Sequence, residues 1–239
     1  MNALTPRERR GLWIRLALFV LALLLLMGVM HAPRDRWLSI VPLELAPSAA
    51  AFRELVVNGW QELGSVAPGG VPSFWRLRGN LFVDSVLFVP AYVSLLLFFT
   101  LGFMSRGDGD SVRRQLLGVP AVAAGLFDIA ENGMTGRALD DLIDFALVDA
   151  TVADVSLAAR LKWALLALAL LLLAWRVFVN RAGDAPWRGV AAALSAVVAL
   201  LFAYGAARSV PGVLDAGLLL LLPALALLSW RALRRPAFS

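Results

Sequence analysis

Long apolar runs constrain this chain more than any other feature of its sequence. Leu16–Met30 contains no polar side chain, and Leu161–Trp175 contains one, that of Lys162. A helix needs about 20 mostly apolar residues to cross a membrane. The whole chain is 60% hydrophobic, above the roughly 45–50% of an average soluble protein. These runs predict an all-α fold, a polytopic transmembrane helical bundle.

The spacing of the apolar runs predicts about six spans in a single membrane domain that covers residues 1–239. The first run follows a basic stretch, as in a signal peptide, but Met30 and Ala32 make a poor cleavage site, so we expect the segment to be retained. The predicted spans are approximately 12–30, 80–104, 116–135, 157–179, 189–207 and 213–230.

Two longer connections, 31–79 and 136–156, separate the predicted spans. Within the first, Pro47–Gly64 carries Phe52 and Val56 at helical spacing with charged residues between them. This pattern predicts an amphipathic helix that lies on the bilayer or caps the bundle. The second connection contains the acidic stretch Ala138–Asp154, in which intervening apolar residues suggest another interfacial helix.

The distribution of basic residues predicts the orientation. If both termini are cytoplasmic, the short loops between spans are basic on the cytoplasmic side, as the positive-inside rule requires. We therefore expect a protein of the bacterial inner membrane with periplasmic segments 31–79 and 136–156. The cytoplasmic side then holds 13 of the 22 lysine and arginine residues: Arg7, Arg9, Arg10, Arg15, Arg106, Arg113, Arg114, Arg176, Arg181, Arg188, Arg231, Arg234 and Arg235.

Composition also argues against several kinds of ligand. The arginines punctuate apolar segments and do not form one basic face, which argues against nucleic acid. His31 is the one histidine and there is no cysteine, so we expect no metal site. No phosphate-binding loop is visible, and we expect no cofactor.

Several ionisable or polar residues lie inside the predicted spans. Asp128 is 12 residues into the third span, roughly 18 Å up a hydrocarbon core about 30 Å thick. Glu131 and Asn132 follow on the same helical face, and Lys162 lies about one turn inside the outer end of the fourth span. Each position depends only on its own helix, yet all fall in the outer third of the membrane.

A buried charge costs several kcal/mol unless it is paired, so we expect these residues to contact one another. Lys162 should pair with Asp128 or Glu131, and Pro90 should bend the second span. The predicted catalytic residues are Asp128, Glu131 and Lys162, and the predicted ligand-binding residues are Asp84, Tyr92, Asn132, Arg160 and Tyr204.

The segment from Asn80 to Trp163 resembles a family of small bacterial polytopic membrane proteins. The resemblance is carried by Asp128, Glu131 and Asn132 as D-x-x-E-N in one helix, by D-x₅-P-x-Y from Asp84 to Tyr92 before it, and by Lys162 after it. The family has no known activity, so the resemblance implies only that these residues matter.

Three functions fit the sequence. The leading hypothesis is binding of an amphiphilic lipid-like or isoprenoid-like ligand in a polar pocket near the periplasmic face, with Asp128 or Glu131 as acid or base and Lys162 as electrostatic partner. The second is a small proton-coupled transporter or channel. The third is a non-catalytic accessory or assembly subunit that binds a membrane protein partner, with the charged residues as a structural clasp.

Overall fold

The computed structural model describes residues 40–64, 72–102, 111–179 and 186–234, and all secondary structure within them is helical. The predicted all-α fold is therefore confirmed. The predicted first span, 12–30, lies outside the described residues. Three described segments, Leu77–Leu97, Asp149–Val179 and Gly189–Arg208, are long and apolar enough to cross a membrane.

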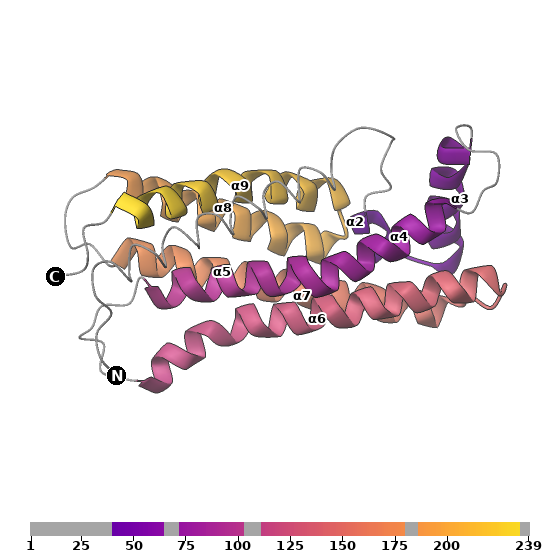
Figure 1. Ribbon diagram of the computed structural model, residues 1–239, viewed down its shortest axis with the longest axis horizontal. Helices are drawn as coiled ribbons and strands as arrows, with labels where there is room; N and C mark the ends of the chain where they lie inside the picture. Colours follow the sequence, from indigo (N-terminus) through magenta and orange to yellow (C-terminus); the bar gives the residue numbers. More distant parts are fainter. Residues whose placement is uncertain (1–39, 65–71, 103–110, 180–185, 235–239) are drawn as a thin grey trace.

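Two long helices form the spine of the bundle. Helix α6 (Ser111–Ile143) has 33 residues and α7 (Asp149–Val179) has 31, so at about 1.5 Å per residue each is close to 50 Å long. They run antiparallel and pack against each other along the bundle (Figure 1). The acidic stretch predicted as a separate interfacial helix is not one, because α6 continues through Asp140 and Asp141 to Ile143.

The remaining long helices pack along this spine. Helix α8 (Pro186–Arg208) packs on α7, and α9 (Pro211–Arg234) packs on α8. A third continuous helical segment consists of α4 (Pro72–Val83), a π-helical turn η1 (Asp84–Phe88) and α5 (Val89–Gly102). Helix α5 packs against α6.

The first described helices form a cap at one end of the bundle, which we call the cap end. Helix α2 (Ile40–Glu44) contacts α6, α7 and α9, and α3 (Ala49–Gly64) packs on α7. At this end α6 and α7 project beyond α8 and α9, and α3 stands across the bundle axis (Figure 1). The amphipathic helix predicted at Pro47–Gly64 is thus present, and Phe52 and Val56 are buried on its inner face.

The described residues form two apolar cores. The main core lies between α5, α6, α7, α8 and α9, with Val41 and Leu45 of the α2 region at its edge. The cap core joins α3, the end of α6 and the start of α7 to Leu77 and Leu81 of α4, and it includes Leu43 and Phe52. Two leucines near the end of α2 thus enter different cores: Leu43 enters the cap core and Leu45 enters the main core. Glu44 lies between them.

Glycines bring α5 and α6 close together in the main core. A Cβ atom on Gly125 would lie 2.6 Å from Val93 Cγ2, and one on Gly118 would lie 2.7 Å from Leu97 Cδ2. A methyl group at Gly125 would require the branched side chain of Val93 to move, and one at Gly118 would require the end of the Leu97 side chain to move. Close backbone approach at small residues is a common way to pack helices when apolar side chains face both protein and lipid.

Candidate functional site: the Lys162 cluster

Lys162 of α7 is the centre of a buried charged group. Its Nζ lies 2.9 Å from Glu131 Oε2, 3.0 Å from Glu44 Oε1 and 3.2 Å from Asp128 Oδ1. Glu131 is completely buried, and the other three residues are at most 5% exposed. We call Glu44, Asp128, Glu131 and Lys162 the Lys162 cluster. Its ammonium group also lies 4.9 Å from the centre of the Trp163 ring.

Each carboxylate of the cluster also accepts a hydrogen bond on its other oxygen. Trp163 Nε1 donates to Glu44 Oε2 at 3.0 Å. The hydroxyl group of Tyr92 donates to Asp128 Oδ2 at 2.8 Å, and Thr135 Oγ1 donates to Glu131 Oε1 at 2.7 Å. All six carboxylate oxygens of the cluster thus have a partner within the chain. Such pairing is what makes buried charges tolerable in a medium of low dielectric constant.

Helical spacing explains how α6 supplies half of the cluster. Asp128, Glu131, Asn132 and Thr135 stand at i, i+3, i+4 and i+7, which places all four on one face. Apolar residues continue the same face on both sides, with Ala124 in the main core and Ala138 in the cap core. The cluster therefore forms a polar layer between the two apolar cores.

A second polar pair extends this layer towards the surface. Asn132 Nδ2 donates to Asp84 Oδ2 at 2.6 Å. Asn132 is buried, but Asp84 is only partly buried. Asp84 also begins the π-helical turn, in which its carbonyl oxygen accepts from the backbone N–H of Val89. Such wide turns are often found at functional sites.

Pro90 accounts for the position of this turn. Proline has no N–H to donate, and its ring would collide with a carbonyl oxygen one turn earlier in a regular α-helix. The sequence predicted a bend at Pro90; the structure has a π-helical turn that ends two residues before it, at Phe88. The turn lies between Asp84, which bonds to Asn132, and Tyr92, which bonds to Asp128.

Most of the predicted site residues meet as expected. Asp128, Glu131 and Lys162 form the cluster, Tyr92 bonds to it, and Asn132 with Asp84 forms the adjoining pair. The other two predicted residues do not join. Arg160 donates to Ser209 Oγ at 2.9 Å on the opposite side of α7 from Lys162, and Tyr204 is 56% exposed.

Glu44 is the member of the cluster that sequence reasoning missed. It was assigned to a polar connection, where an acidic residue is ordinarily solvated. One signal could have identified it: Glu44 is the one charged residue in the apolar stretch Ile40–Ala46. A lone carboxylate between Leu43 and Leu45 has to be buried with a partner if its neighbours are buried.

The arrangement limits the chemistry that the cluster can perform. Lys162 Nζ occupies the position between the carboxylates that a metal ion would need, and the described residues contain no group of three or more histidine, cysteine or acidic residues suited to a metal. The hydroxyl groups of Tyr92 and Thr135 both donate to carboxylates. In this arrangement every carboxylate oxygen of the cluster is occupied by a partner within the chain.

Comparison with known proteins adds no further assignment. No protein-family model matches the sequence, and neither a curated protein nor a solved structure matches it. The resemblance carried by the D-x-x-E-N pattern therefore stays a prediction, and the case for a function depends on the geometry of the Lys162 cluster.

Proposed function

We propose that this chain is a non-catalytic accessory or assembly subunit of a bacterial inner membrane, with the Lys162 cluster as its structural clasp. The observation that carries the proposal is that all six carboxylate oxygens of the cluster are paired within the chain. No carboxylate oxygen of the cluster is left over for a ligand in this arrangement. Here the cluster instead connects α2 to α6 and α7.

The clasp has a physical role because apolar helix surfaces distinguish poorly between protein and lipid. Glu44 is the one cluster member contributed by the cap, and it bonds to two residues of α7, Lys162 and Trp163. Pairing at one defined position fixes where the cap sits on the bundle. Loss of one partner leaves the others as unpaired buried charges.

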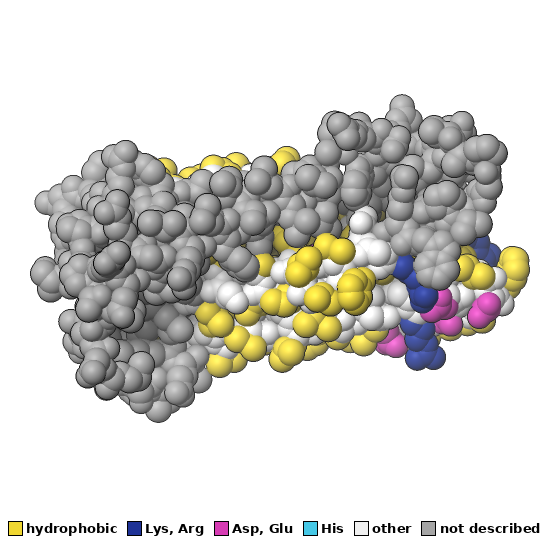
Figure 2. Space-filling view, viewed as in Figure 1, with side chains coloured by type: hydrophobic (Ala, Val, Ile, Leu, Met, Phe, Trp, Pro, Cys, Tyr) yellow, Lys and Arg dark blue, Asp and Glu magenta, His cyan; other side chains and the backbone are white. Residues whose placement is uncertain are grey.

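The membrane setting of this proposal includes about six spans with both termini in the cytoplasm. Three apolar helices support it, as does the exposed apolar face of α6 formed by Val119, Val122, Leu126 and Ile129. Figure 2 shows apolar side chains along the middle of the molecule and charged ones gathered towards the cap end. There Arg78 of α4 pairs with Asp140 of α6, and Arg137 is exposed.

We take this charged zone as the periplasmic boundary of the bilayer. Glu131 precedes Arg137 by six residues on the same helix, which corresponds to about 9 Å. Under the proposed orientation the cluster lies about that far inside the periplasmic boundary, in the outer third of the bilayer.

Lipid analysis of a charge-neutral variant tests the clasp. Glu131→Gln and a control at an exposed residue, Asp154→Asn, would be purified in mild detergent, and their bound lipids compared with wild type by native mass spectrometry. A clasp predicts a lower unfolding temperature for Glu131→Gln and an unchanged set of bound lipids. Loss of a stoichiometric lipid from folded Glu131→Gln would contradict the proposal.

A second candidate function is the binding of an amphiphilic ligand, with Asp128 or Glu131 as acid or base. One observation favours it: the polar layer reaches the surface at partly buried Asp84, beside the exposed apolar side chains of Phe82 and Leu87. A lipid head group could approach the layer from the bilayer at this point. Asp84→Asn tests this function directly, because it keeps the shape of the Asp84–Asn132 pair and should remove a bound amphiphile seen in the wild type.

A further inference from the structure

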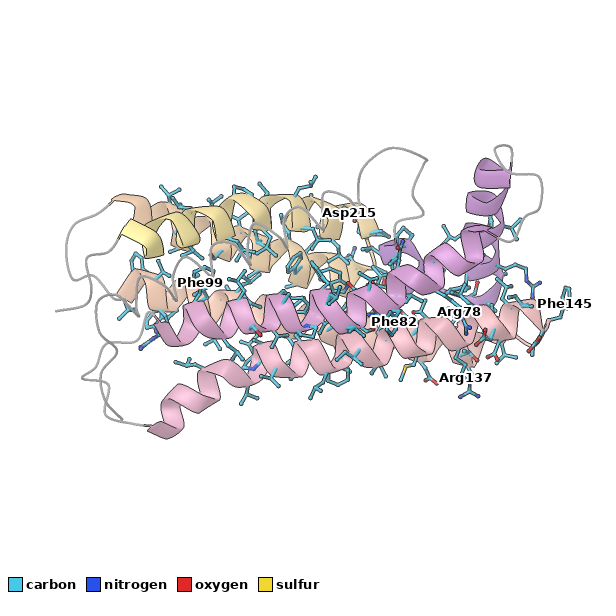
Figure 3. The ribbon with its side chains drawn as sticks, in the orientation of Figure 1. Arg78, Phe82, Phe99, Arg137, Phe145 and Asp215 are labelled. Atoms are coloured by element: carbon cyan, nitrogen blue, oxygen red, sulfur yellow. The ribbon has the colours of Figure 1, made fainter. Side chains whose placement is uncertain are left out.

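The loop between α6 and α7 presents an unusual phenylalanine. Phe145 is 90% exposed, and its φ angle of 56° lies in the left-handed region. Both properties are unfavourable, because a bulky residue rarely adopts positive φ and a large apolar ring gains stability from burial. Figure 3 places Phe145 at the outermost tip of the hairpin, pointing away from the protein.

The local backbone would favour glycine at this position. The N–H of Ala146 donates to the carbonyl of Asp141 at 2.7 Å and closes the end of α6, with Phe145 as the left-handed residue in between. Helix ends of this type usually place glycine there. The phenylalanine is therefore not explained by the needs of the turn.

Ser209 provides a comparison within the same chain. It ends α8 in the same way, with φ of 52° and a 2.9 Å bond from the N–H of Val210 to the carbonyl of Gly205. Its side chain has a partner within the chain, since Oγ accepts a surface hydrogen bond from Arg160. At 90% exposed, the Phe145 ring has no such role among the residues that the structure describes.

The surroundings of Phe145 indicate what would bind it. Ile143 and Val148 are 46% and 55% exposed, so they extend the apolar tip. Asp144 and Asp149 are exposed beside it, so the tip has an acidic rim. A complementary surface is an apolar pocket edged with lysine or arginine.

The position of the tip favours a protein over a lipid surface. Ile143, the last residue of α6, follows Arg137 by six residues, so the tip begins about 9 Å beyond Arg137, whereas the head-group layer is about 5–7 Å thick. The acidic rim would also be repelled by anionic lipids. We propose that the tip formed by Ile143, Phe145 and Val148 docks into a basic-edged apolar pocket of a partner protein on that side of the membrane. This inference extends the proposed accessory role by naming where a partner binds.

Photocrosslinking in cells tests the docking site. A photoreactive phenylalanine analogue would replace Val148 in the full-length chain, and a control would carry it at Phe82, which is 67% exposed elsewhere on the surface. We expect one discrete protein adduct from position 148 and none of that mass from position 82. Mass spectrometry should then locate the crosslink in an apolar pocket with basic residues at its edge.

Two further changes separate docking from folding. Phe145→Gly, introduced with the probe at position 148, should reduce the adduct at least tenfold while the unfolding temperature stays equal or rises. Asp144→Lys should also reduce it at least tenfold. Adducts only with lipid or with a second copy of this chain, or an adduct unaffected by Phe145→Gly, would overturn the inference. If Glu131→Gln changes the lipids that co-purify with the folded protein, the clasp is refuted, but the docking result is unaffected.

Discussion

Glu44 Oε1 and Lys162 Nζ lie 3.0 Å apart, although one residue belongs to a five-residue helix of the cap and the other to α7, the longest of the three described segments that are apolar enough to cross a membrane. This ion pair joins two parts of the chain that are distant in sequence. It also completes a layer in which one ammonium group faces three carboxylates between two apolar cores.

Removal of the ammonium group should destabilise the fold strongly. Lys162→Met leaves three buried carboxylates without their cation, and breaking a buried ion pair in this way costs about 3–5 kcal/mol. Arg160→Gln is the matched control, because Arg160 lies two residues away on the exposed side of α7. The free energy of unfolding, measured in detergent, should be lower for Lys162→Met than for Arg160→Gln. Equal values would show that the cluster does not stabilise the fold.

The attachment of the cap can be tested at the start of α3. Asp149 Oδ1 accepts from the backbone N–H of Ala49 at 2.7 Å, and Ser48 Oγ accepts from that of Ala51 at 3.2 Å. Asp149→Ala removes a helix cap and should cost about 1 kcal/mol. Hydrogen exchange should become faster at Ala49, whereas Asp154→Ala should leave it unchanged. Unaltered exchange in Asp149→Ala would mean that this contact does not fix the cap.

Much of the Lys162 cluster could be predicted from the sequence because helical spacing carries the information. Asp128, Glu131 and Asn132 share one face of a helix, however that helix is oriented. Lys162 is the one lysine in the sequence, so it is the expected ion-pair partner of the two carboxylates. Glu44 could not be found in this way, because a five-residue helix has no periodicity and its position depends on tertiary packing. The same limit applies to the C-terminal end of α6 and the N-terminal end of α7. In the sequence their acidic residues resemble those of a solvated loop. Only the tertiary structure shows that the cap core covers one side of each helix end.

Glycine substitutions test the packing of α5 on α6. In Gly125→Ala the new methyl group would meet Val93, whose branched side chain has little rotational freedom, so the variant should lose about 1–3 kcal/mol. Gly133→Ala is the control, since nothing lies within 4 Å of its added Cβ. Alanine favours a helix by up to about 1 kcal/mol over glycine, so this control should be neutral or stabilising. Thermal unfolding of both variants measures the difference. An unfolding temperature of Gly125→Ala equal to that of Gly133→Ala would show that α5 and α6 are not in close contact at Gly125.

The proposed orientation can be tested because the chain has no native cysteine. Asp144→Cys should react with a membrane-impermeant maleimide added to intact spheroplasts, whereas Gly107→Cys should react only after lysis. Labelling of position 107 in intact spheroplasts would place this loop in the periplasm and contradict the proposed orientation.

The central claim is that Glu44 and Lys162 act together to fasten the cap to the bundle. The most direct measurement is a double-mutant cycle, with the free energy of unfolding determined for wild type, Glu44→Gln, Lys162→Met and the double variant. Because the two groups are buried and in contact, we predict a coupling free energy of at least about 1.5 kcal/mol. A coupling within about 0.5 kcal/mol of zero, the range typical of independent sites, would contradict the account.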